Sequence, residues 1–101
     1  MIVVNAVIET TQADIEAMRS TMTAMETASQ AEDGCHDYTF SIELNDPTRL
    51  RITERWETLE ALQAHFQTPH MAEFQKAMAA NPPLNLEVIF YDAKEIPSPL
   101  G

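Results

Sequence analysis

Two neighbouring segments in the middle of the chain alternate apolar and polar residues, and this pattern constrains the fold most strongly. Over residues 36–44 the even-numbered positions after His36 are aromatic or aliphatic, whereas the odd-numbered positions are polar. The same alternation returns over residues 50–56. A period of two is typical of a strand with one buried face. Because the turn-forming residues Asn-Asp-Pro-Thr at 45–48 separate the two segments, the sequence predicts a β-hairpin.

A strand and an amphipathic helix are predicted before this hairpin. Residues 2–9 are mostly apolar and β-branched on both faces, with Asn5 as the exception, which predicts a strand covered on both sides. Thr11 followed by Asp14 resembles a capping box. Apolar residues then recur at helical spacing, at Ile15, Met18, Met22 and Met25. We expect Gly34 to end this helix as a left-handed cap.

The remaining segments predict two helices and a last strand. A short helix is expected from Thr58 to about Phe66, and Thr68-Pro69 begins a second one. Residues 84–94 form the last predicted strand. The order β-α-β-β-α(α)-β predicts an α+β fold, the ferredoxin-like split β-α-β with an antiparallel four-stranded sheet. We expect one domain over residues 1–101, with its core at about 2–92 and a C-terminal tail at 93–101.

The charge balance excludes several classes of partner. Sixteen acidic residues against six Lys and Arg give a net charge of −10, which disfavours binding to nucleic acid or to an anionic membrane. No apolar stretch is long enough to span a bilayer, and the start of the chain lacks the features of a signal peptide. Cys35 is the single cysteine, so an intramolecular disulfide is excluded. We therefore expect a cytoplasmic protein.

The first and last strands predict a homodimer. Both carry apolar residues on both faces, whereas the predicted helices cover only one face of the sheet. The uncovered face would exceed the apolar patch that a monomer usually exposes. A second copy packed sheet against sheet would cover it.

An ordered set of motifs runs through most of the chain. Residues 32–35 read Glu-Asp-Gly-Cys and lead to Tyr38, residues 54–57 read Glu-Arg-Trp-Glu, and Leu62, His65, Thr68-Pro69-His70 and Phe74 follow. This set resembles the antibiotic biosynthesis monooxygenase family, nearest to its quinol monooxygenase branch. The resemblance implies a dimeric α+β barrel that oxidises quinol- or anthrone-like phenols with O₂ and needs no flavin, haem or metal.

The same family contains other chemistries, and two positions bear on them. His65 stands where the haem-degrading branch carries a tryptophan, which argues against haem degradation. Ile52 stands where the polyketide branch carries an asparagine, so the chemistry of that branch does not transfer directly. An isomerase acting on a phosphorylated sugar-like signal shares the Thr-Pro-His segment.

His65 and His70 are the candidate catalytic residues. A phenolate donates an electron to O₂ far better than a neutral phenol, so a base that titrates near neutral pH is needed. His65 alternatively caps the end of its helix. His70 lies in a first helical turn, where the helix dipole keeps an imidazole neutral; alternatively it only begins the helix or contacts the partner copy.

Asn5, Tyr38 and Trp56 are the candidate substrate-binding residues, in the same pocket as the two histidines. Trp56 ends a strand on its apolar side, where it either lines an aromatic pocket and donates its N–H to substrate or packs in the core. Tyr38 shares the inward side of its strand and has the same two interpretations. A buried Asn5 needs a hydrogen-bond partner, either a structural one or a ligand carbonyl.

No metal site and no cofactor are predicted. His65 and His70 are five residues apart across a helix break, unlike the i, i+4 pair of a zinc-binding helix, and the chain has no dinucleotide fingerprint. The leading hypothesis is therefore a cofactor-independent monooxygenase that acts on a small aromatic substrate and O₂. The alternatives are an isomerase of a small carbonyl metabolite, phosphorylated or not, that uses the same histidine pair, and a non-catalytic dimer that binds a small ligand.

Overall fold

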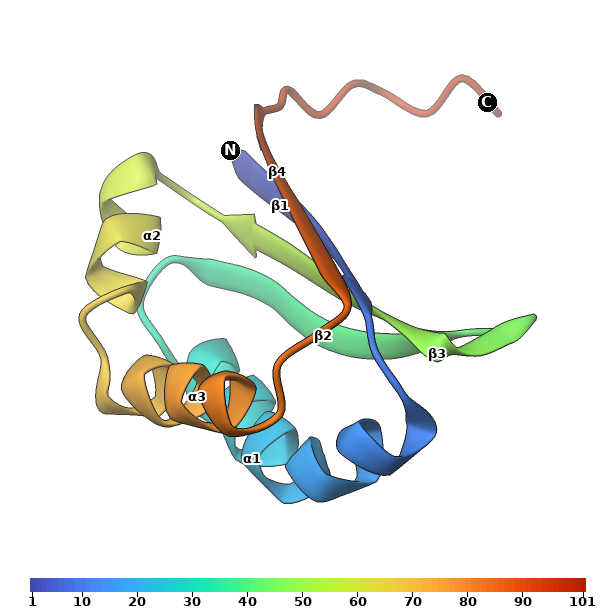
Figure 1. The fold of residues 1–101 in the computed structure, drawn as a ribbon. Coiled ribbons are helices and arrows are strands. Elements are labelled where there is room, and N and C mark those ends of the chain that lie inside the picture. Colours follow the sequence, from blue (N-terminus) through green and yellow to red (C-terminus); the bar gives the residue numbers. More distant parts are fainter.

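Three helices lie on one face of a four-stranded antiparallel sheet in the computed structural model of residues 1–101 (Figure 1). The sheet order is β2-β3-β1-β4. The elements along the chain are β1 (Ile2–Glu9), α1 (Gln12–Gln30), β2 (Cys35–Glu43), β3 (Asp46–Trp56), α2 (Leu59–His65), α3 (Pro69–Ala80) and β4 (Asn85–Asp92). This arrangement confirms the predicted α+β ferredoxin-like fold. None of the helices combines the length and the apolar character needed to cross a membrane.

The central hairpin forms as predicted, but its turn is shorter. Glu43 pairs with Asp46, so the turn consists of Leu44 and Asn45 alone, and residues 46–48 already belong to β3. The expectation of a turn over residues 45–48 is therefore wrong. The strand register is irregular at this point, between the pairs Glu43–Asp46 and Ile42–Leu50. Pro47 fits such an irregularity because it has no N–H to give to a ladder.

Hydroxyl side chains cap all three helices where the sequence predicts them. The Oγ1 atoms of Thr11, Thr58 and Thr68 accept from backbone N–H groups three residues on, at 3.1, 3.1 and 3.3 Å. The end of α1 differs from the prediction, because its cap is Ala31 in a right-handed conformation. Gly34 does have a positive φ of 80°, but it lies beyond the cap. A Cβ at Gly34 would lie 2.8 Å from the Cβ of Ala61, so this glycine lets α2 approach the loop.

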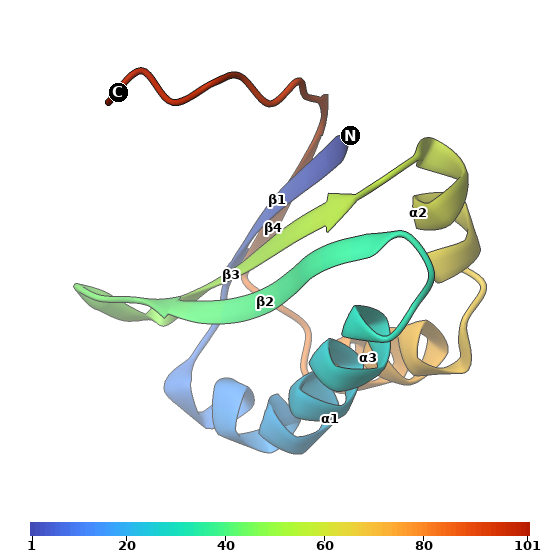
Figure 2. The ribbon, with the colours of Figure 1, turned by 180° about the vertical axis from the view of Figure 1, so that it is seen from behind.

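The helices leave the last strand uncovered. The core lies between the three helices and the strands β1, β2 and β3, and its largest fully buried side chains include Trp56, Tyr38 and Met18. Every residue of β4 is exposed, although Leu86, Val88 and Phe90 point to the same side of the sheet as the core residues of β1. Residues 93–101 form neither helix nor strand and lead away from the sheet (Figure 2).

Candidate active site

A cavity of about 440 Å³ lies between the sheet and the helices α2 and α3. Its lining is largely apolar and comes from all four strands and from α2 and α3, with Phe74 and Phe90 among its walls. Tyr38, Glu54 and His65 supply polar groups to the same cavity, and neither Lys nor Arg lines it. An apolar pocket with a few polar groups is the usual form of a small-molecule site.

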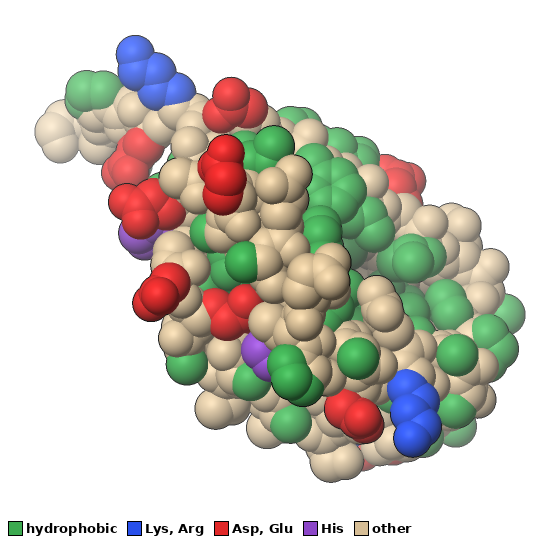
Figure 3. Space-filling model, turned by 90° about the vertical axis from the view of Figure 1, so that its left-hand side faces the viewer, with side chains coloured by type: hydrophobic (Ala, Val, Ile, Leu, Met, Phe, Trp, Pro, Cys, Tyr) green, Lys and Arg blue, Asp and Glu red, His purple; other side chains and the backbone are tan.

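The protein carries far more acidic than basic side chains. Figure 3 shows acidic side chains spread among hydrophobic and neutral ones, with basic side chains only near the edges of the view. A net charge of −10 favours neutral or weakly acidic ligands over strongly anionic ones.

Glu32 joins the two predicted catalytic histidines. Glu32 lies in the loop after α1, His65 ends α2, and His70 lies in the first turn of α3. Nδ1 of His65 is 2.7 Å and Nε2 of His70 is 2.8 Å from the same Glu32 oxygen, Oε2. Because an ionised carboxylate only accepts hydrogen bonds, both ring nitrogens donate their N–H groups to Glu32. In a neutral His65 the other nitrogen, Nε2, therefore carries a free lone pair.

The environment of His65 keeps its imidazole neutral. The residue is 1 % exposed, and burial lowers its pKa below the ordinary value, although the hydrogen bond and charge of Glu32 act in the opposite direction. The ring centroid of His65 lies 4.8 Å from that of Trp56 and 5.3 Å from that of Tyr38. A buried neutral imidazole, oriented by a carboxylate, can accept a proton at Nε2.

The structure changes what can be expected of three of the predicted site residues. His70 does not line the cavity; it binds Glu32, and its ring centroid lies 5.8 Å from that of His65. Trp56 is fully buried, and its indole N–H donates to Glu54 Oε1 at 2.9 Å, so the N–H is not free for a substrate. Tyr38 does line the cavity, and burial raises its pKa well above the ordinary value. Its hydroxyl thus remains a proton donor near neutral pH.

The placement of Asn5 in this cavity is wrong. Asn5 pairs with Thr53 and Ile89, and its side chain is exposed on the face of the sheet opposite the helices. Its neighbours Val4 and Ala6 line the cavity instead. Side chains alternate along a strand, so a residue between two cavity residues must point away.

Glu54 is a site residue that sequence reasoning missed. The residue is only 7 % exposed, and burial together with the nearby charge of Glu32 raises its pKa to about 7, although the Trp56 N–H acts in the opposite direction. The signal was available, because Glu54 is a charged residue on the inward side of the predicted strand. Glu32 gave no such signal, since its partners lie 33 and 38 residues away.

The same three side chains, Glu32, His65 and His70, are those that could hold a metal ion. Their ligand atoms all lie within 4.8 Å of one another, and two imidazoles with a carboxylate are a donor set that zinc accepts. Local spacing could not suggest this set, because the third member comes from a distant loop. The hydrogen bonds of Glu32 already engage one nitrogen of each imidazole.

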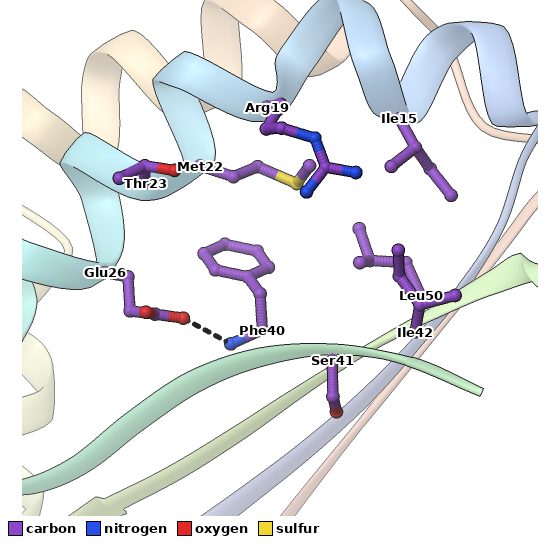
Figure 4. A pocket seen from close by; sticks show the side chains of 9 residues that line it. All are labelled: Ile15, Arg19, Met22, Thr23, Glu26, Phe40, Ser41, Ile42 and Leu50. Carbon is purple, nitrogen blue, oxygen red and sulfur yellow. Dashed lines mark hydrogen bonds between the residues drawn. The ribbon is translucent and has the colours of Figure 1, made fainter. Parts of the chain in front are cut away.

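A second cavity, of about 310 Å³, lies between α1 and the strands β2 and β3 (Figure 4). Its two charged side chains have partners: Arg19 binds Glu16, and the Glu26 carboxylate accepts from the backbone N–H of Phe40 at 2.8 Å. No histidine lines it. The cavity with His65 and Glu54 is therefore the better candidate for proton chemistry.

Comparison with known proteins assigns the family. The family model described as antibiotic biosynthesis monooxygenase matches residues 1–77, which include Glu32, Glu54, His65 and His70. The chain belongs to this family. The match ends before β4, so the exposed cavity wall that β4 supplies lies outside it.

Individual proteins resemble the chain to different extents. A protein of Escherichia coli K12 named "Probable quinol monooxygenase YgiN" is 34% identical over 55 residues. That alignment covers 46% of this chain and 53% of the relative, about half of its length. A Deinococcus radiodurans protein ascribed to the antibiotic biosynthesis monooxygenases matches over the full length of both chains, with a TM-score of 0.89 and 25% identity. Rv0793 of Mycobacterium tuberculosis shares the fold with a TM-score of 0.84 at 24% identity and covers 96% of this chain and 98% of that one.

Proposed function

We propose that this protein is a monooxygenase that oxidises a quinol-like aromatic with O₂ and without a cofactor. The observation that carries the proposal is the free Nε2 of a buried His65, oriented by Glu32, at the edge of a largely apolar cavity. Membership of the monooxygenase family and the partial likeness to a quinol monooxygenase support the same reaction class.

The reaction begins with a proton transfer to His65. Nε2 takes the proton of a ring hydroxyl, and Glu32 stabilises the imidazolium that forms. The phenolate then gives one electron to O₂, and the superoxide recombines with the ring radical to form a C–O bond. Overall, a quinol and O₂ yield a hydroxyquinone and water, so atoms and electrons balance. A general base of this kind contributes roughly 10²- to 10⁴-fold to the rate.

The other cavity groups suit this substrate class. The Tyr38 hydroxyl can donate to the second substrate oxygen, and the apolar walls exclude water and accept both an aromatic ring and O₂. A phosphorylated substrate would need a permanently cationic group, and neither Lys nor Arg lines the cavity. This favours a quinol over the phosphorylated metabolite of the isomerase hypothesis.

We further propose that the protein is a cytoplasmic homodimer that packs sheet against sheet. The face opposite the helices exposes Ile89 and Tyr91 by 40% and 47%, beside the half-buried Val3 and Val7. The arginines on this face already pair with neighbouring acids, for example Arg51 with Glu43 at 3.0 Å. A face that neutralises its own charges and exposes apolar side chains suits a second copy of itself. The single free Cys35 suits a reducing compartment.

Oxygen uptake tests the proposed reaction. We expect the protein to consume O₂ with a reduced naphthoquinol faster than the quinol autoxidises, and His65→Gln to reduce the catalysed rate at least about 100-fold. His36→Gln, which alters an exposed histidine outside the site, is the matched control and should keep the full rate. A rearranged product without oxygen uptake would support the isomerase instead, and tight binding without turnover would support the ligand-binding dimer.

A further inference from the structure

Glu54 is a buried carboxyl group that the proton transfer to His65 does not use. It lines the cavity that His65 also lines, and only 7 % of it is exposed. The Trp56 indole N–H donates to Oε1. Oε2 is not among the buried side-chain atoms that lack a partner, which fits an oxygen open to the cavity. One carboxyl oxygen is thus fixed in place by the protein and the other is available to a bound molecule.

We propose that Glu54 is a catalytic acid–base residue that removes the ring-carbon proton of a para-quinol after oxygen has added beside its hydroxyl group. The inference rests on the proposed function and deepens it. It assigns the two protons lost from the quinol to two different residues of the same cavity, the hydroxyl proton to His65 and the ring proton to Glu54.

When the radical pair recombines and the imidazolium of His65 returns its proton, the ring carbon next to the new ketone carries both a hydroperoxide and its original hydrogen. Glu54 takes this hydrogen as a proton, and the C–H electron pair forms a second C=O bond while the O–O bond breaks. The departing hydroxide takes the proton from Glu54 and leaves as water. The product is a hydroxyquinone, and Glu54 is again ionised.

The surroundings of Glu54 suit a group that must both accept and return a proton. The titratable groups around it are Glu32, Cys35 and Tyr38, whose charges interact with that of Glu54, and His65, which lines the same cavity. Its neighbour on β1 is the apolar Val4. Burial among these groups holds the pKa of Glu54 at about 7, where acid–base exchange is most efficient.

The proposal predicts which quinols the protein hydroxylates. A para-quinol with a hydrogen on a ring carbon next to a hydroxyl should yield hydroxyquinone and water. A quinol substituted at all four such carbons has no proton for Glu54, so its peroxide must leave as H₂O₂ and give the plain quinone.

The variant Glu54→Gln tests the role of the carboxylate, because glutamine keeps the size and can still accept the Trp56 N–H. We expect oxygen uptake to continue while the hydroxyquinone yield falls about 100-fold and H₂O₂ with plain quinone replaces it. Catalase should then return half of the consumed oxygen, but none with wild type. Glu57→Gln, a change at an exposed glutamate, is the matched control and should behave like wild type.

A measurement on the wild-type protein tests the proposal even if Glu54→Gln fails to fold. Deuterium on the ring carbon should slow the loss of that proton and move the products from hydroxyquinone toward H₂O₂, and an unchanged product ratio would overturn the proposal. Wild-type hydroxyquinone yield in Glu54→Gln would overturn the role of Glu54 alone. If the wild type consumes no oxygen with any quinol, the proposed function fails and the role of Glu54 fails with it.

Discussion

Replacing Glu54 by glutamine should stabilise the protein more above neutral pH than at acidic pH. Burial raises the pKa of Glu54 from an ordinary 4.5 to about 7, so the folded protein holds this proton over a pH range in which the unfolded chain has lost it. The free energy of unfolding therefore falls as the pH rises from about 4.5 to 7, and above pH 7 this whole loss of stability is present. At about 1.4 kcal/mol per unit of pKa, the pKa shift of Glu54 corresponds to a loss of stability of roughly 3 kcal/mol.

Urea unfolding of both proteins at a series of pH values measures this cost. Far-UV circular dichroism at one fixed protein concentration follows the transition, and Trp56, the only tryptophan, gives a second probe by fluorescence. The free energy of unfolding of Glu54→Gln relative to wild type should rise by about 3 kcal/mol between pH 4 and pH 8. Burying the glutamine amide adds an offset that does not depend on pH. If the difference in free energy of unfolding between the two proteins does not change over this pH range, burial does not raise the pKa of Glu54.

Three further predictions concern residues other than Glu54. Glu32→Gln should shift the acid limb of the pH profile of kcat/KM to lower pH, because the Glu32 charge raises the His65 pKa. If the acid limb does not move, Glu32 does not position His65. Ile89→Asp should yield monomers in sedimentation velocity, and a persistent dimer would place the interface elsewhere. Gly34→Ala should lower the free energy of unfolding by about 1–3 kcal/mol in urea titrations, since it combines a positive φ with a close approach to Ala61.

Local sequence signals were enough to predict the elements of the fold. The capping threonines and the alternation in the hairpin act within a few residues, so their outcome depends little on the rest of the chain. The hairpin turn was misplaced because Asn45 and Pro47 both favour turns, whereas the pairing of Glu43 with Asp46 is set by the strands themselves. Propensity locates a turn only to within a few residues.

The site needed information that local patterns do not contain. The resemblance and the chemistry make His65 and His70 candidates, but the carboxylate that joins them lies in a loop more than 30 residues away. Asn5 was misplaced because an apolar strand does not show which of its faces meets the helices. Glu54 is the opposite case, since a lone acid on the inward face of a strand is visible in the sequence itself.

The absorption spectrum of a bound quinol without oxygen tests the central claim most directly. Under anaerobic conditions near pH 7 no electron can leave the substrate, so the protein can only bind the quinol and remove its proton. We predict a phenolate absorption band with wild type and with His36→Gln that is stronger than the same quinol gives in buffer at that pH, and only the neutral spectrum with His65→Gln. A quinol that binds wild type but stays neutral, or that ionises equally in His65→Gln, would contradict the account.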